Sequence, residues 1–272
     1  MRVLAILVAA VALTGCGGSS DEELPLPVVV ASFYPLAWAA DELTELRVEN
    51  LTPPGVEPHD LELSPRDVEL VRDASLVVYA GGGFQPAVED AVARRSRPSF
   101  DVLGDDDSDP HVWLDPPRFA EIVSGLGRAL GTGRRAASLQ RELLLLDQHY
   151  RRGLERCDRR VLVTTHTAFG QLANSYGLTQ LALTGTSPEA EPTPRDLERL
   201  IDEVERSGAT TVFAEPLVSD RLARTVAREA GVDIATLDPL EGLSQEQLAA
   251  GEDYVSVMRS NLAVLRKALG CR

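Results

Sequence analysis

A long segment without proline, from Arg134 to about Arg156, lies in the middle of this 272-residue chain. Apolar side chains recur along it every three to four residues, as on one face of a helix: Leu139, Leu143, Leu146 and Tyr150. With a rise of about 1.5 Å per residue, such a helix is roughly 35 Å long, about the width of a small domain. Its length and central position favour a rigid connector between two lobes over an ordinary surface helix.

Strand-like and helix-like segments alternate on both sides of this connector. Short apolar runs typical of buried strands occur at 28–31, 48–51, 76–80, 99–103, 160–164, 178–183, 210–214 and 233–237. Helical patterns separate them, which predicts parallel strands with crossover helices. We therefore expect an α/β fold of two lobes, each with a parallel β-sheet flanked by helices, joined by one long rigid backbone helix. The predicted boundaries are 27–130 for the N-terminal lobe, 131–157 for the connecting helix and 158–272 for the C-terminal lobe.

The N-terminus has the pattern of an export signal. Arg2 precedes an apolar run, Val3 to Leu13, that is too short to span a bilayer and ends in small residues. The order Leu13-Thr14-Gly15-Cys16 resembles a bacterial lipobox, which implies that residues 1–15 are removed and that Cys16 carries a lipid. Residues 16–26 then form a tether on the outer side of the cytoplasmic membrane, at the cell surface or in the periplasm. The alternative is an ordinary signal peptide cut nearby, with Cys16 lost or free.

Charge and cysteine content narrow the possible partners and the redox state. The formal net charge of −15 would repel phosphate backbones, so we expect no nucleic-acid partner. An exported protein meets an oxidising compartment, where disulfides form. Cys157 and Cys271 could therefore form a disulfide that ties the last helix to the second half of the chain. Two free buried thiols are an equally open alternative, because geometry cannot be read from sequence.

The chain has four histidines, and three of them follow strand-like runs. These three are His59, His111 and His166, and Asp238 has the same setting after the run at 233–237. Side chains at the carboxyl ends of parallel strands converge, so we expect these four to meet. Three imidazoles and one carboxylate would make a closed four-coordinate site that suits Zn²⁺. The fourth histidine, His149, lies inside the connecting helix and is expected to face solvent.

Five motifs, in order along the chain, together resemble one protein family: Gly55-Val56-Glu57-Pro58-His59-Asp60, Asp109-Pro110-His111-Val112-Trp113-Leu114-Asp115-Pro116, Thr165-His166-Thr167-Ala168-Phe169-Gly170, Glu191-Pro192-Thr193-Pro194 and Asp238-Pro239-Leu240. They are similar to motifs of the zinc- and manganese-binding solute-binding lipoproteins of bacterial ABC importers (ZnuA/TroA-like, cluster A-I).

This resemblance implies two lobes on a long backbone helix, with a metal ion held at their interface. The implied ligands are His59 and His111 from the first lobe, and His166 and Asp238 from the second. Glu215, in Phe213-Ala214-Glu215-Pro216, is implied as a supporting carboxylate. Trp113 is expected to serve in packing and Asp115 as a helix cap. The resemblance also implies a monomer that delivers its metal to an ABC permease.

Zinc is the expected cargo, with Mn²⁺ or Fe²⁺ as the alternative. Manganese-binding members of the family tend to carry a carboxylate where His166 stands, and nitrogen ligands favour zinc over manganese. The chain departs from many zinc-binding members because Asp105-Asp106-Asp107-Ser108-Asp109 stands where those members have a histidine-rich loop.

We expect a receptor that captures Zn²⁺ between the lobes for an ABC-type permease, and not an enzyme. An exported zinc hydrolase would need an open coordination position and a general base, and the chain has no His-Glu-x-x-His motif. A surface adhesin fits the lipid anchor but leaves the histidines without a role.

Overall fold

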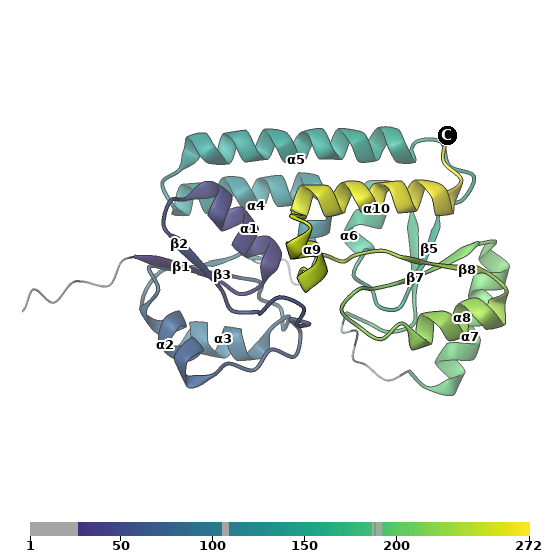
Figure 1. Ribbon diagram of the computed structural model, residues 1–272, viewed down its shortest axis with the longest axis horizontal. Helices are drawn as coiled ribbons and strands as arrows, with labels where there is room; N and C mark the ends of the chain where they lie inside the picture. Colours follow the sequence, from purple (N-terminus) through teal and green to yellow (C-terminus); the bar gives the residue numbers. More distant parts are fainter. Residues whose placement is uncertain (1–26, 105–108, 187, 189–191) are drawn as a thin grey trace, which may run out of the picture.

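The computed structural model describes residues 27–104, 109–186, 188 and 192–272. It contains two four-stranded parallel sheets with the orders β2-β1-β3-β4 and β6-β5-β7-β8. The strands are β1 (Val28–Ala31), β2 (Arg47–Asn50), β3 (Leu76–Tyr79), β4 (Ser99–Asp101), β5 (Val161–Thr164), β6 (Thr179–Ala182), β7 (Thr211–Ala214) and β8 (Asp233–Thr236). Helices flank each sheet, so that two lobes lie side by side (Figure 1). The predicted fold class is confirmed.

One long helix, α5 (Gly133–Leu154), runs along both lobes (Figure 1). At about 1.5 Å per residue its 22 residues span roughly 33 Å. It packs against α4 (Pro116–Ala129) of the first half of the chain and α10 (Tyr254–Leu269) at the end of the second. The connector that the sequence predicted between Arg134 and Arg156 is therefore one unbroken helix.

A single apolar core joins the two lobes. Val29 in the first sheet, Leu143 in α5 and Leu162 in the second sheet belong to the same cluster of buried residues. Each lobe also has a smaller cluster of its own. The cluster of the first lobe includes Val71 and Val77, and that of the second includes Val204 and Val212. Because the shared cluster is close-packed, large rigid-body motion of one lobe against the other would disrupt core contacts.

The remaining helices begin and end largely where local signals predict. They are α1 (Tyr34–Leu43), α2 (Pro65–Asp73), α3 (Pro86–Ala93), α6 (Gly170–Ser175), α7 (Pro194–Ser207), α8 (Arg221–Ala230) and α9 (Gln245–Ala249). Ser64 and Thr193 each form a capping box with the aspartate three residues later, which satisfies free N–H groups of α2 and α7. The 3₁₀ helix η1 (Val112–Leu114) and α9 were not predicted.

Hydrogen bonds also cross between the two halves of the chain. The indole Nε1 of Trp113 donates to the carbonyl of Pro239 at 2.8 Å, and the hydroxyl of Tyr254 donates to the carbonyl of Trp113 at 2.6 Å. Asp115 occupies the N-cap position of α4, as predicted, but its side chain makes no capping bond. It accepts instead a hydrogen bond from the Ser175 hydroxyl at 2.8 Å. The polar groups around η1 thus connect the lobes.

Cys157 and Cys271 form a disulfide between residues 114 positions apart in sequence. It ties the chain just after α5 to the chain just after α10, where the C-terminus lies beside the end of the long helix (Figure 1).

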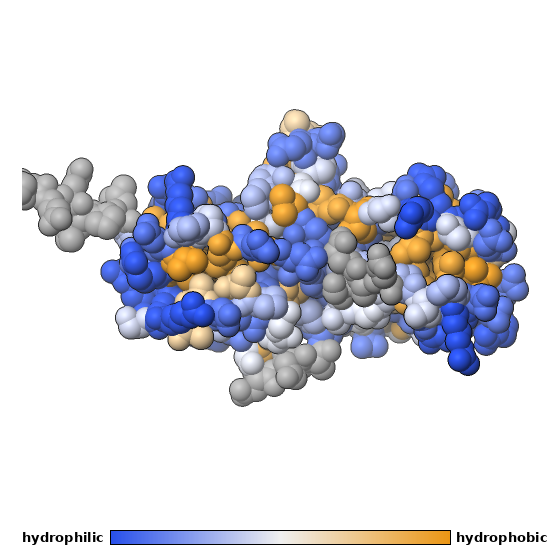
Figure 2. All heavy atoms as spheres, turned by 90° about the horizontal axis from the view of Figure 1, so that it is seen from below, coloured by the Kyte–Doolittle hydropathy of each residue, from blue (hydrophilic) through white to orange (hydrophobic). Residues whose placement is uncertain are grey.

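Cys16 and the predicted signal peptide and tether lie outside the described residues. Within the described residues, no helix combines the length and apolar character needed to cross a membrane. The face opposite α5 is mostly hydrophilic, with smaller apolar areas on both lobes (Figure 2).

Candidate metal centre

Three histidine side chains converge on one carboxylate oxygen. The Nε2 atoms of His59, His111 and His166 lie 3.3, 3.1 and 3.3 Å from Oε1 of Glu241. Ligand atoms of these four residues all lie within 4.8 Å of one another. His111 and His166 are fully buried, and the side chains of His59 and Glu241 are only 7% and 2% exposed. This is a compact, buried set of three nitrogen donors and one oxygen donor.

The parallel sheets explain why these residues meet. His59 follows β2, His111 follows β4, His166 follows β5 and Glu241 follows β8. Each side chain therefore lies beyond the carboxyl end of a strand, the edge at which ligand sites form in such sheets. The first lobe supplies His59 and His111, and the second supplies His166 and Glu241.

A second carboxylate holds each of the two fully buried rings in place. Nδ1 of His111 lies 2.9 Å from Oδ1 of Asp109, and Nδ1 of His166 lies 2.8 Å from the carboxylate of Glu215. An Nδ1–H that donates to a carboxylate leaves the Nε2 lone pair free to bind a metal. Glu215, which the sequence suggested only as a supporting carboxylate, contacts His166 in this way and also accepts a hydrogen bond from the Thr165 hydroxyl.

Such an arrangement needs positive charge at its centre. Nε2 lone pairs that point at a carboxylate oxygen repel it unless a cation lies between them or the rings carry a second proton. Burial alone would lower the pKa of His166, but the carboxylates of Glu215 and Glu241 raise it to about 10. Burial also opposes the charge on Glu241, yet hydrogen bonds from His111, His166 and His59 hold its pKa well below the usual value. Protons can thus balance the charge in the metal-free protein, and a metal ion that bound here would have to displace them.

The structure does not bring Asp238, the predicted fourth ligand, to the three histidines. Its Oδ1 accepts a hydrogen bond from the main-chain N–H of Leu240 at 2.7 Å, and its Oδ2 accepts one from Nε2 of Gln247 at 2.8 Å. The side chain of Asn261 also fixes the main chain of Asp238: its Oδ1 accepts a hydrogen bond from the Asp238 N–H, and its Nδ2 donates one to the Asp238 carbonyl. Both carboxylate oxygens are occupied within the 238–247 segment, and Glu241 takes the position predicted for Asp238.

Glu241 reaches the site through an unusual turn. Leu240 has φ +56°, the only positive φ of a non-glycine residue in the described chain. This left-handed conformation costs roughly 1–3 kcal/mol outside glycine and persists only where surrounding contacts enforce it. Sequence reasoning missed Glu241 because it chose the first acidic residue after β8. The available signal was a second acidic residue three positions later, directly before Gly242.

Two further residues border the site. Gly170 allows a close approach between the lobes, because a Cβ placed there would lie 2.8 Å from Oδ2 of Asp109. Glu57 is a mostly buried carboxylate beside His59. Burial and the charge of Glu241 raise its pKa to about 8.

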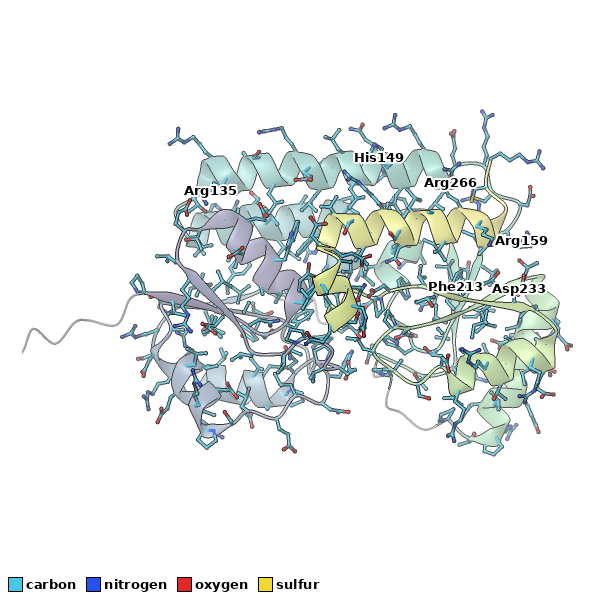
Figure 3. The ribbon with its side chains drawn as sticks, in the orientation of Figure 1. Arg135, His149, Arg159, Phe213, Asp233 and Arg266 are labelled. Atoms are coloured by element: carbon cyan, nitrogen blue, oxygen red, sulfur yellow. A yellow bond between two sulfur atoms is a disulfide. The ribbon has the colours of Figure 1, made fainter. Side chains whose placement is uncertain are left out.

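His149, in contrast, is exposed on α5 (Figure 3), as expected for a residue outside the metal centre.

Comparison with known proteins identifies the family. The model of the ZnuA family, described as the periplasmic component A of a zinc-uptake complex, matches residues 29–268. The chain belongs to the ZnuA family. The description of this family names zinc uptake and a periplasmic location. The predicted resemblance to this family is confirmed on this basis.

Individual relatives agree with ZnuA membership. The zinc-binding lipoprotein AdcA of Streptococcus pneumoniae is 30% identical over 98% of this chain, which spans only 61% of that relative's length. The Zn(II)-bound ZnuA-like domain of the same AdcA is 32% identical, with a TM-score of 0.76 over 90% of this chain and 99% of that domain. The laminin-binding protein of Streptococcus agalactiae, described as having adhesin and metal-transporting activity, is 30% identical. Its TM-score is 0.81 over 89% of this chain and 99% of that chain.

Proposed function

We propose that this protein captures Zn²⁺ outside the cytoplasm with His59, His111, His166 and Glu241, and delivers it to an ABC-type permease. The observation that carries this proposal is the convergence of three buried Nε2 atoms on one carboxylate oxygen, at 3.1–3.3 Å. Four protein ligands of this kind suit zinc, which binds histidine nitrogen and carboxylate oxygen in four-coordinate sites. The names of the relatives, which mention zinc binding and zinc uptake, support the same cargo.

The donor set favours zinc over the alternatives Mn²⁺ and Fe²⁺. Imidazole suits zinc, whereas manganese prefers carboxylate and water oxygens. Three nitrogens and one oxygen therefore place zinc first. Because the ligands must lose protons to bind, affinity for any of these ions should fall in acid.

Capture and release require local movement. His111 and His166 have no solvent-exposed surface, so a bound ion could leave only if residues around them move. The core shared by both lobes resists a wide hinge motion. We infer that the loops that carry His59 and Glu241 move, and that the permease senses the positions of these loops.

The anchor, the partner and the assembly state belong to the same proposal. We infer that Cys16 is lipid-modified, that residues 16–26 tether the protein to the outer side of the cytoplasmic membrane, and that it works as a monomer beside its permease. A zinc hydrolase is disfavoured because a site with four protein ligands lacks the open position that catalytic zinc keeps. An adhesin function is described for the Streptococcus agalactiae relative, and no observation on this chain requires it.

Metal titration of the stripped protein tests the assignment. We expect one Zn²⁺ per chain in a competition titration with a chromophoric chelator. His59→Ala, His111→Ala, His166→Ala and Glu241→Ala should each weaken binding by at least about tenfold. His149→Ala is the matched control, because its side chain is exposed on α5, and it should bind as wild type does. Unchanged affinity across the four site variants would refute the proposed function.

A further inference from the structure

A fifth oxygen atom borders the cluster of three histidines and Glu241. The carboxylate of Glu57 is 11% exposed and comes from the same loop as His59. Its Oε2 accepts a hydrogen bond from the main-chain N–H of His59 at 3.0 Å. Its Oε1 is buried, lies 3.9 Å from Nε2 of His59, and makes no hydrogen bond within the part of the chain that the structure describes. One oxygen is thus fixed in place and the other is free.

A buried carboxylate oxygen without a donor is costly and calls for a physical cause. Burial of a polar atom without a hydrogen bond costs about 1–3 kcal/mol, and more if the atom is charged. Native proteins keep few such atoms, and a bound ion or water molecule can satisfy those that remain. Glu57 Oε1 lies 3.9 Å from Nε2 of His59, and the negative charge of Glu241, which lies against the same nitrogen, acts on the Glu57 carboxylate. A cation is the partner that this environment fits.

The position of Oε1 allows it to reach an ion held by the histidines. Its distance to Nε2 of His59 exceeds the distance from that nitrogen to Oε1 of Glu241 by 0.6 Å (3.9 against 3.3 Å). A rotation of the terminal carboxylate bond covers such a difference, because this torsion is broad. The hydrogen bond from the His59 N–H to Oε2 limits this rotation to a small adjustment that leaves the carboxylate beside the ring.

We propose that Glu57 is a fifth, oxygen ligand of the cation and sets how well the site accepts oxygen-preferring metals. This inference rests on the proposed function, since it concerns the same cation. A second carboxylate balances the full charge of a divalent ion and converts a set of three nitrogens and one oxygen into three nitrogens and two oxygens. Manganese gains more than zinc from an added oxygen ligand and a higher coordination number. Glu57 therefore narrows the preference of the site for zinc over manganese.

Glu57→Gln tests the proposal in the full-length protein. Glutamine keeps the shape of the side chain and removes its charge, and the metal-free fold should tolerate it because Oε1 has no hydrogen bond to lose. Competition titrations would measure Zn²⁺ and Mn²⁺ affinity, and visible absorption of bound Co²⁺ would report coordination number. We expect Mn²⁺ affinity to fall by about tenfold or more and Zn²⁺ affinity by less than about threefold. The Co²⁺ bands should gain intensity as the site approaches four-coordination.

Two variants complete the test. Glu62→Gln removes an exposed carboxylate from the same segment and should leave both affinities and the Co²⁺ spectrum unchanged. Glu57→Asp keeps the charge but shortens the reach, and it should reproduce the loss of Mn²⁺ affinity. Equal losses of Zn²⁺ and Mn²⁺ affinity in Glu57→Gln would overturn the proposal, because they would show that Glu57 only positions His59. The proposal would also be overturned if the ratio of Zn²⁺ affinity to Mn²⁺ affinity in Glu57→Gln equalled that of the wild type. A wild-type protein that binds no zinc would instead refute the proposed function itself.

Discussion

Oδ1 of Asp238 accepts a hydrogen bond from the main-chain N–H of Leu240 at 2.7 Å, across a turn in which Leu240 has φ +56°. Directly after this turn, Glu241 meets the three histidines. Asp238 thus affects the site indirectly, because its hydrogen bond to the Leu240 N–H positions the neighbouring Glu241.

Substitutions at Asp238 should separate this positioning role from direct ligation. Asp238→Ala removes the acceptor that supports the left-handed turn, and we expect zinc affinity to fall by about tenfold. Asp238→Asn keeps an oxygen acceptor for Leu240, so it should retain affinity within about threefold of wild type. Competition titration of both variants checks the difference. If Asp238→Asn were as damaging as Asp238→Ala, the carboxylate itself would bind the ion.

Gly170→Ala should weaken zinc binding although Gly170 is not a ligand. The new Cβ would lie 2.8 Å from Oδ2 of Asp109 and push that carboxylate away from Nδ1 of His111. Loss of such a supporting carboxylate typically costs about 10–100-fold in metal affinity. Gly133→Ala is the control, since a Cβ there meets nothing within 4 Å. Wild-type affinity in Gly170→Ala would mean that Asp109 does not orient His111.

The metal-free protein should lose stability as the pH rises from about 6.5 to about 10. Its fold raises the pKa of His166 from 6.5 to about 10 through Glu215 and Glu241, against the opposing effect of burial. A raised pKa means that the folded state binds the proton more tightly, so this contribution is complete below pH 6.5 and lost as the pH approaches 10. Urea unfolding at several pH values measures it. The decline should be smaller in His166→Gln, and an identical slope in that variant would contradict the prediction.

The disulfide should contribute to stability and not to zinc affinity. Cys157 and Cys271 are 114 residues apart, and closing so long a loop restricts the unfolded chain. We expect the double variant Cys157→Ser/Cys271→Ser to lose about 2–4 kcal/mol of unfolding free energy in denaturant titrations. Zinc affinity should stay within about twofold, because the bond joins the far ends of α5 and α10. A stability equal to that of wild type would show that packing between α5 and α10 alone holds these ends together.

The sequence predicts the three histidines of the site better than it predicts the carboxylate, Glu241, that they meet. His59, His111 and His166 were found because each follows a strand-like run, and parallel strands place such residues at one edge. Glu241 was missed because its position depends on a left-handed turn at Leu240, a residue type that rarely adopts one and so gives no local signal. The hydrogen bond of Trp113 to Pro239 and the core shared by both lobes depend on pairings between distant residues, which periodicity does not encode.

The core shared by the two lobes also bears on how fast cargo can be exchanged. A buried ion can escape from this rigid core only through a rare local opening. The residence time of the bound ion should therefore be much longer than the duration of a diffusional encounter. A receptor of this kind holds its cargo by a kinetic barrier as well as by affinity. Under the proposed function, unloading would then be work done by the permease, which would have to displace the loops that carry His59 and Glu241 rather than wait for them to open.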